Sequence, residues 1–260
     1  MSRGLHVESV GAGPPLVLLH GWAMHSGLWG PLVAHLARRF RVHAVDLPGH
    51  GHSAPAPVPT LAAIADQIAR RFAAEDAPPT VVGWSLGGLV AMQWAATAPA
   101  GVARLVLVCT TPCFVAQDDW PHAMPAATLA RFGDELRLAY RLTLQRFLAL
   151  QLRGSDDGRA VLAALRQALF ARGDPVPNAL ASALSLLAAA DLRGVVPAIA
   201  APTLVVAGDR DTLTPPEASA WLASALPAAR LAPIPGAGHV PFLSHPAAFN
   251  AALEAFLDAR

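Results

Sequence analysis

The sequence predicts an α/β domain in which a mostly parallel β-sheet is flanked by helices and carries an inserted helical cap. Short apolar runs alternate with Ala- and Leu-rich helical patterns, as is typical of a parallel sheet buried between helices. This alternation stops after Pro112 and resumes at Ala201, with only helical periods between about Trp120 and Ala190. Hydrophobic residues make up 54% of the 260 residues and charged residues 14%, which is enough apolar material for a continuous core.

The apolar runs and helical periods define the elements of the expected core. The expected strands are Pro15–Leu19, Val42–Val45, Thr80–Val82, Leu105–Cys109 and Thr203–Ala207, all continuous apolar runs. The expected helices are Trp29–Ala37, Leu61–Ala74, Gly87–Ala98 and Ala247–Ala259. Residues 1–112 and 191–260 are therefore assigned to the core, and residues 113–190 to the cap.

Composition excludes several classes of function. A net charge of +1 gives no overall field that would drive the protein onto nucleic acid or an anionic membrane. Cys109 and Cys113 are spaced one residue too far apart for a C-x-x-C motif and have no partners for a zinc site. A disulfide between them is the alternative to the reduced thiols that are more usual in a cytosolic protein and are expected here. Residues 1–13 lack an apolar signal region, and the longest apolar stretch, residues 179–190, is too short to span a bilayer. We therefore expect a cytoplasmic monomer without membrane contact.

A candidate nucleophile stands in Gly83-Trp-Ser85-Leu-Gly87, which matches G-x-S-x-G. An apolar strand precedes this motif and an Ala-rich helix follows it. Glycines on either side of Ser85 allow a tight strand-to-helix turn, which lifts the hydroxyl off the sheet to the start of the helix. The alternative, a glycine-rich turn with an incidental serine, does not explain why the motif sits between a strand and a helix.

A serine hydroxyl needs a base, and the base needs an acid that fixes its tautomer. In sheets with this type of turn, the acid and then the histidine follow the serine along the chain. His239 lies in a small-residue loop between a late strand and the final helix, and is the predicted base. Asp209 and Asp211 both follow the strand Thr203–Ala207. Asp211 is favoured because it is deeper in the loop, whereas Asp209 could form a turn or pair with Arg210.

The remaining histidines have structural interpretations. His245 is expected in the first turn of the last helix, and His122 in the cap. His20 precedes Ser85 in the chain and is expected to brace its own loop. Asp46 opens a second glycine-rich loop, which it is expected to tie down. That loop lacks the strand–G-x-G-x-x-G–helix arrangement of a dinucleotide site.

An oxyanion hole requires two backbone N–H donors. One is predicted at Leu86, directly after the nucleophile. The other is predicted at Trp22, in the turn after the strand Pro15–Leu19, where the indole could also wall the acyl pocket. The chemistry predicted from these residues is acyl transfer through a covalent intermediate, and it requires no metal or organic cofactor.

Together these motifs resemble α/β-hydrolases with a helical cap. More narrowly, the chain is similar to the pimeloyl-[acyl-carrier protein] methyl ester carboxylesterases of biotin synthesis. The narrower resemblance rests on these segments: Leu19-His-Gly-Trp22, Gly83-Trp-Ser-Leu-Gly-Gly-Leu-Val90, Pro112-Cys-Phe114, Asp119-Trp-Pro121, Arg146-Phe-Leu-Ala-Leu-Gln151 and His245-Pro. It implies hydrolysis of the methyl ester of the carrier-bound pimeloyl chain, which releases methanol.

The resemblance also implies roles for individual residues. It implies catalysis by Ser85, Asp211 and His239, with the oxyanion held at Trp22 and Leu86. It implies a substrate site formed by these residues together with Phe147, Leu148, Ala149, Leu150 and Gln151. A broad-specificity short-chain carboxylesterase and a non-catalytic small-molecule receptor are the alternatives on the same fold.

The cap is more basic than the core. Residues 121–172 hold eight arginines and four acids, whereas the rest of the chain holds 11 arginines and 14 acids. Such a patch could steer an acidic carrier protein, the partner that the resemblance implies. The candidate docking residues are Arg141, Arg146, Arg153 and Arg159. The alternative is a set of solvated helix faces.

Overall fold

A seven-stranded sheet forms the centre of the computed structural model, which describes residues 4–56, 60–156 and 158–259. The strand order is β1-β3-β2-β4-β5-β6-β7; β1 is antiparallel to β3, and the other neighbouring pairs are parallel. The strands are β1 (Val7–Val10), β2 (Pro15–Leu19), β3 (Arg41–Val45), β4 (Thr80–Trp84), β5 (Arg104–Val108), β6 (Thr203–Gly208) and β7 (Ala229–Ile234). This is the predicted mostly parallel sheet.

The five expected strands are confirmed to within two residues at each end. The two edge strands, β1 and β7, had no predicted bounds. Each edge strand leaves several side chains exposed, and neither has the continuous apolar run of a strand covered on both faces. Continuous apolar runs therefore predicted the interior strands of the sheet but not its two edge strands.

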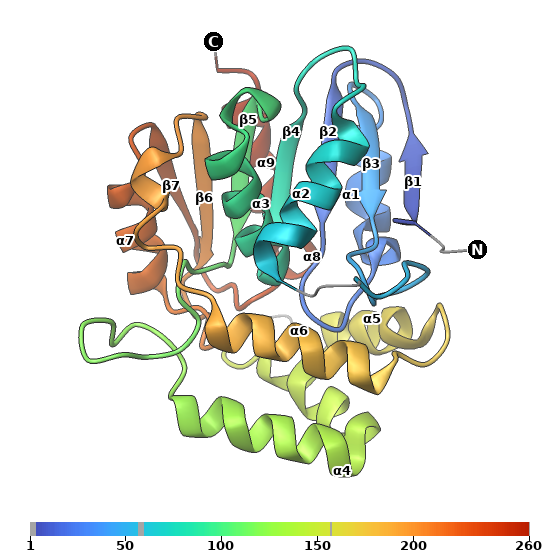
Figure 1. The fold of residues 1–260 in the computed structure, drawn as a ribbon, viewed down its shortest axis with the longest axis vertical. Coiled ribbons are helices and arrows are strands. Elements are labelled where there is room, and N and C mark those ends of the chain that lie inside the picture. Colours follow the sequence, from blue (N-terminus) through green and yellow to red (C-terminus); the bar gives the residue numbers. More distant parts are fainter. Residues whose placement is uncertain (1–3, 57–59, 157, 260) are drawn as a thin grey trace.

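Helices cover both faces of the sheet (Figure 1). The helices α2 (Leu61–Phe72) and α3 (Leu86–Thr97) pack together on one face, and α1 (Gly30–Leu36) and α9 (Pro246–Leu257) lie on the other. Towards the β7 edge, α7 (Pro216–Ala225) packs against β6 and β7. The short helices are α8 (Pro241–Ser244) and the 3₁₀ turns η1 (Ser26–Trp29), η2 (Pro99–Gly101) and η3 (Val196–Ala198). The four predicted core helices are confirmed, although the first divides into η1 and α1.

Three further helices lie together at one end of the sheet (Figure 1). They are α4 (Ala126–Leu150), α5 (Gly158–Phe170) and α6 (Pro177–Ala189), and α4 is bent at Ala139, where φ is −149° and ψ is 58°. All three fall inside the segment predicted as the cap. Across the described ranges, no helix combines the length and the apolar character that crossing a membrane requires.

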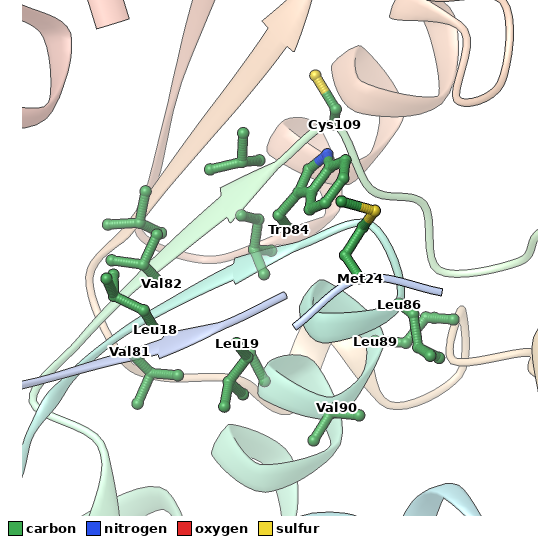
Figure 2. Packing of buried hydrophobic residues seen from close by; sticks show 14 of the residues in the cluster. Leu18, Leu19, Met24, Val81, Val82, Trp84, Leu86, Leu89, Val90 and Cys109 are labelled. Atoms are coloured by element: carbon green, nitrogen blue, oxygen red, sulfur yellow. The ribbon is translucent and has the colours of Figure 1, made fainter. Parts of the chain in front are cut away.

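Buried hydrophobic residues pack around the central strands and the start of α3 (Figure 2). Leu18, Leu19, Val81 and Val82 from β2 and β4 are fully buried. The apolar residues of α3 pack on the same strands, so the β4–α3 connection is held from both sides. This well-packed connection contains Ser85.

Candidate functional site

Ser85 occupies a strained turn between β4 and α3. Its φ of 54° and ψ of −117° lie in a region that non-glycine residues rarely adopt. A Cβ atom on Gly83 would overlap the carbonyl oxygen of Gly87, and one on Gly87 would overlap the carbonyl oxygen of Leu19. A side chain at either position would therefore clash with the backbone, which agrees with the prediction that small residues here allow the tight turn.

Two residues that the sequence analysis missed also support this turn. The Thr110 hydroxyl donates to the carbonyl oxygen of Ser85 over 2.8 Å. A Cβ atom on Gly88 would lie 2.5 Å from the Oγ1 atom of Thr110, so Gly88 must also be small. The Gly-Gly pair at the start of α3 was the available signal for Gly88, whereas nothing in the sequence links Thr110 to Ser85.

His239 and Asp211 form a buried hydrogen-bonded pair. The Nδ1 atom of His239 lies 2.7 Å from the Oδ2 atom of Asp211, and the two side chains are 2% and 1% exposed. A carboxylate at this distance selects the tautomer with the proton on Nδ1, which leaves the Nε2 lone pair free to accept a proton. The pair therefore has the arrangement expected of a base and its orienting acid.

The Asp211 carboxylate is held by further donors. The backbone N–H groups of Leu213 and Thr214 donate to its Oδ1 atom over 2.8 and 3.1 Å, and the Thr214 hydroxyl donates to Oδ2 over 2.6 Å. Burial alone would raise the pKa of Asp211, but the charge of His239 and these hydrogen bonds hold it below its usual value. Asp211 is thus kept ionised despite its burial. Thr214 was not singled out in the sequence analysis.

The backbone around His239 connects three parts of the site. Its N–H donates to the carbonyl oxygen of Gln151 over 2.9 Å, and its carbonyl oxygen accepts from the Trp84 indole over 2.8 Å. Trp84 directly precedes Ser85, and its indole ring lies 5.6 Å from the His239 ring. These contacts bring the His239 loop, the nucleophile turn and the end of α4 to one place.

Cys109 is a further neighbour that the sequence analysis treated only as a reduced thiol. Its Sγ atom, a carboxylate oxygen of Asp211 and a ring nitrogen of His239 all lie within 4.8 Å of one another. Burial, followed by the charge of Asp211, raises the pKa of the Cys109 thiol well above its usual value. The thiol is therefore a neutral neighbour of the acid–base pair. Both Cys109 and Cys113 are free, as expected.

Asp209 has a different role from Asp211. Its Oδ1 atom accepts a hydrogen bond from the Gly236 N–H over 2.8 Å and so ties the β6 and β7 loops together. The proposed pairing of Asp209 with Arg210 is wrong, because Arg210 turns towards the cap segment and pairs with Asp156. Of the two candidate acids, the structure brings only Asp211 to His239.

The other histidines lie where the sequence analysis expected them. His20 accepts from the Leu47 N–H over 2.9 Å, and its other ring nitrogen lies 2.8 Å from the carbonyl oxygen of Gly21, so it braces two loops. His245 is the N-cap residue of α9. His122 lies beside Trp120, with ring centroids 5.9 Å apart.

The loop that contains Trp22 runs next to the nucleophile. A Cβ atom on Gly21 would lie 3.2 Å from the Cβ atom of Ser85. The Trp22 indole donates to the carbonyl oxygen of Leu180 in α6 and meets the Phe147 ring edge-on at 4.9 Å. Leu86 is the first residue of α3, where helix N–H groups are free to bind an anion. Leu86 thus directly follows Ser85, and Gly21, the residue before Trp22, lies against the Ser85 side chain.

The segment Phe147–Gln151 turns its residues in different directions because it is helical up to Leu150. Leu148 is fully buried and Phe147 packs on Trp22, whereas Ala149 and Leu150 lie on the exposed face. Gln151 is 1% exposed, and neither polar atom of its side chain has a hydrogen-bond partner among the described residues. An unpaired buried amide is costly, so Gln151 is the member of this segment best suited to meet a polar ligand.

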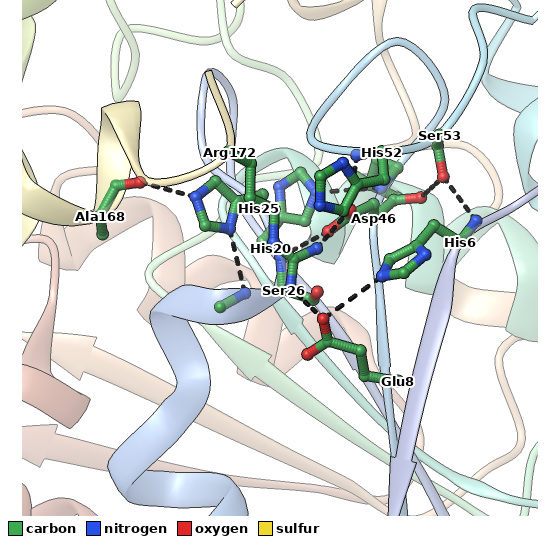
Figure 3. A network of polar contacts seen from close by, with 12 residues as sticks. His6, Glu8, His20, His25, Ser26, Asp46, His52, Ser53, Ala168 and Arg172 are labelled. Carbon is green, nitrogen blue, oxygen red and sulfur yellow. Dashed lines mark hydrogen bonds and ion pairs between the residues drawn. The ribbon is translucent and has the colours of Figure 1, made fainter. Parts of the chain in front are cut away.

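A buried polar network fastens the cap to the core (Figure 3). Arg172 pairs with Asp46 over 2.6 Å and also with Glu8, and a ring nitrogen of His25 lies 2.6 Å from the carbonyl oxygen of Ala168. The Asp46 side chain is fully buried and that of Arg172 is 11% exposed. Asp46 also accepts from the N–H groups of Ser26 and His52, as its predicted loop-tying role requires.

This network changes the interpretation of the cap charge. Arg172 was counted with the cap arginines, but it neutralises core carboxylates instead of facing solvent. On the surface, Arg141 pairs with Asp174 and Arg146 with Glu135. For Arg153 and Arg159, the described residues include no carboxylate partner. Of the four docking candidates, Arg141 and Arg146 are therefore the two whose charge is paired with a carboxylate of this chain within the described ranges.

Comparison with known proteins gives consistent matches over almost the whole chain. A sequence model of the alpha/beta hydrolase fold matches residues 14–246. A pimeloyl-[acyl-carrier protein] methyl ester esterase from Nitrosomonas europaea is 45% identical over 251 residues, covering 96% of this chain and 98% of that protein. The protein of the same name from Chromobacterium violaceum is 46% identical, covering 98% of both chains.

Solved structures agree with the sequence relatives on the fold. A hydrolase from Pseudomonas aeruginosa superposes with a TM-score of 0.84 at 29% identity, covering 98% of this chain and 94% of its own. An esterase from Exiguobacterium antarcticum superposes with a TM-score of 0.89 at 22% identity, covering 98% of this chain and 96% of its own.

Proposed function

We propose that this chain, which belongs to the α/β-hydrolase fold family and within it to the family of pimeloyl-[acyl-carrier protein] methyl ester esterases, hydrolyses the methyl ester of pimeloyl-[acyl-carrier protein] in biotin synthesis. The observation that carries the chemistry is the buried hydrogen bond between His239 and Asp211, beside the strained turn of Ser85. The products are pimeloyl-[acyl-carrier protein] and methanol.

In the proposed mechanism, the Nε2 atom of His239 takes the proton of the Ser85 hydroxyl as Oγ attacks the ester carbonyl. The N–H groups of Trp22 and Leu86 stabilise the oxyanion. The imidazolium is stabilised by the ionised Asp211 and then gives its proton to the departing methoxide, which leaves as methanol. Water, activated by the same histidine, attacks the acyl-enzyme and releases the free acid.

The proposed acyl site lies between the Trp22 loop and the end of α4. The aromatic surfaces of Trp22 and Phe147 and the apolar side chain of Leu148 would contact the methylene chain, and the Gln151 amide would meet a polar group of the substrate. Ala149 and Leu150 would contribute only at the exposed entrance, because they lie on the outer face of the helix. In this proposal residues 113–190 act as the cap that closes the site.

We propose that Arg153 and Arg159 lead the docking of the carrier protein, with Arg141 and Arg146 in support. The reason is that Arg141 and Arg146 already pair with acids of this chain, so binding a partner through them would break existing pairs. We also propose that the protein is cytoplasmic and monomeric.

The first experiment tests the nucleophile. Replacing Ser85 with Ala should abolish hydrolysis of a short p-nitrophenyl ester while the circular dichroism spectrum stays unchanged. Turnover at the wild-type rate would reject the mechanism. Absence of turnover by the wild-type protein itself would favour the alternative of a non-catalytic receptor.

The second experiment tests the substrate. The kcat/KM for pimeloyl-carrier-protein methyl ester should exceed that for free methyl pimelate. Equal values would favour a broad-specificity short-chain esterase. The double replacement Arg153→Glu and Arg159→Glu should raise KM for the carrier-bound ester and leave p-nitrophenyl ester hydrolysis unchanged. Arg230→Glu, at an exposed position on β7, is the control for a general change of charge.

A further inference from the structure

Two side chains share one oxygen atom of Asp211. The Oδ2 atom lies 2.7 Å from the Nδ1 atom of His239, and it also accepts a hydrogen bond from the Thr214 hydroxyl over 2.6 Å. The hydroxyl oxygen lies 3.5 Å from the same Nδ1 atom, and Thr214 is 1% exposed. Thr214 therefore contacts both members of the acid–base pair, although it takes part in no step of the proposed mechanism.

The acceptor sites of the Asp211 carboxylate are filled. Its Oδ1 atom accepts from the N–H groups of Leu213 and Thr214, and its Oδ2 atom from His239 and the Thr214 hydroxyl. An ionised carboxylate offers about four such sites, so it cannot turn without losing a hydrogen bond. Of these four donors, two belong to the backbone and one to the base. The Thr214 hydroxyl is the donor that a substitution can remove without changing either.

The ionisable neighbours of the pair leave this role to Thr214. Cys109 faces Asp211 and His239 from the end of β5, and its buried thiol is neutral. In the loop that follows β6, Asp209 accepts from the Gly236 N–H, and Arg210 pairs with Asp156. The ion pair of His239 is with Asp211. The charge that His239 meets is therefore that of Asp211, modified by the hydrogen bonds that Asp211 accepts.

A second donor on Oδ2 has two physical consequences. It draws charge from the oxygen, so an Oδ2 atom with two donors attracts an imidazolium less strongly than one with a single donor. It also fixes the oxygen in the direction of the Nδ1 proton, and hydrogen bonds weaken as their angle departs from linear. The Thr214 hydroxyl therefore aims the carboxylate at His239 and limits its pull on a protonated ring.

We propose that Thr214 is a positioning residue for the ester hydrolysis proposed above, on which this inference rests, and that its hydroxyl sets the pH range in which His239 can act as the base. Without the hydroxyl, Asp211 holds the protonated imidazole more strongly. The protonated ring then persists to higher pH, where it cannot accept the proton of Ser85.

The first test is the pH profile of the Thr214→Val variant, in which a methyl group replaces the hydroxyl. The acid limb of kcat/KM for p-nitrophenyl butyrate should move to higher pH by about half a unit to one unit, with little change in KM. Thr214→Ser keeps the hydroxyl and should leave the acid limb in place. If Thr214→Val does not fold, Thr214→Ala removes the same hydroxyl and makes the same prediction.

Thr203→Val is the matched control. Thr203 is fully buried at the start of β6, and its hydroxyl donates to the carbonyl oxygen of Ala201 over 2.8 Å. This variant loses a buried threonine hydroxyl away from the acid–base pair, so it should lower stability without moving the acid limb. An unmoved acid limb in the Thr214→Val variant, or an equal shift in Thr203→Val, would overturn the proposal.

The second test needs no turnover. The Nδ1 proton of His239, identified by its absence from the His239→Gln variant, should give a proton NMR signal that moves downfield in Thr214→Val and stays in place in Thr203→Val. The reason is that the remaining hydrogen bond to Oδ2 becomes stronger when the second donor is removed. An unmoved signal in Thr214→Val would overturn the proposal. A wild-type protein that hydrolyses no ester would reject the proposed function instead, and the NMR signal would still decide whether Thr214 acts on the pair.

Discussion

Replacing Asp211 with Asn is the sharpest test of the proposed acid–base pair, because the change is nearly isosteric. The Oδ1 atom can still accept from the N–H groups of Leu213 and Thr214, so the loop should keep its geometry. At the Oδ2 position, however, an amide N–H group would face the Nδ1 atom of His239, now 2.7 Å from a carboxylate oxygen. The imidazole would then move its proton to Nε2 to accept that hydrogen bond.

A histidine in this tautomer cannot accept the proton of Ser85. The loss of a correctly oriented base in a serine triad lowers kcat by about four orders of magnitude, or about 5 kcal/mol of transition-state stabilisation. We therefore expect Asp211→Asn to reduce kcat for p-nitrophenyl butyrate by a factor of about 10⁴ at pH 7.5. The melting temperature should change by only a few degrees, because most of the hydrogen bonds survive.

Asp209→Asn is the matched control. Asp209 lies two residues away and accepts one hydrogen bond from the Gly236 N–H, which an amide oxygen can also accept. This variant should keep kcat within about three-fold of wild type, a difference of less than about 1 kcal/mol in the barrier. If Asp209→Asn lost activity by a factor of 1,000 and Asp211→Asn did not, the assignment of the acid and the argument from hydrogen-bond geometry would both be refuted.

Three further predictions concern stability, each measured by denaturant unfolding. Gly87→Ala should lower the free energy of unfolding by about 3 kcal/mol, because the added methyl group meets the backbone carbonyl of Leu19, which cannot move aside. A loss below about 0.5 kcal/mol would contradict the proposed packing of the turn. Arg172→Met should cost about 3 kcal/mol by leaving the buried Asp46 without its cation, whereas Arg141→Met, at an exposed pair that solvent screens, should leave the unfolding midpoint almost unchanged. Equal losses in the two arginine variants would contradict the role of Arg172 in fastening the cap. The pKa of His50 is lowered from 6.5 to about 4 in the folded protein, so protonation favours the unfolded chain as pH falls below 6.5. About 3 kcal/mol of the free energy of unfolding should be lost by about pH 4. His50→Gln should flatten this part of the curve of stability against pH, and an unchanged slope would count against a buried neutral ring.

The sequence by itself determined the interior of the sheet, the nucleophile turn and the order of the catalytic candidates. Strands buried on both faces appear as continuous apolar runs, and a serine turn between a strand and a helix requires glycine on each side. The interior strands and the nucleophile turn can therefore be predicted from local sequence. The edge strands β1 and β7 were missed or left without bounds because partial exposure removes that apolar signal.

Only the tertiary structure decided which polar groups meet. Asp211 contacts His239 across 28 positions of sequence, and Thr110 contacts Ser85 across 25. The order of the motifs favoured Asp211 over Asp209, but only the fold brings its carboxylate to His239, and nothing in the sequence pointed to Thr110. The same holds for Arg172, which lies 126 residues from Asp46 and was counted as surface charge until the fold placed it in a buried pair. Hydrogen bonds and ion pairs depend on the close approach of distant segments, and that approach is fixed by how the cap and the loops pack on the sheet.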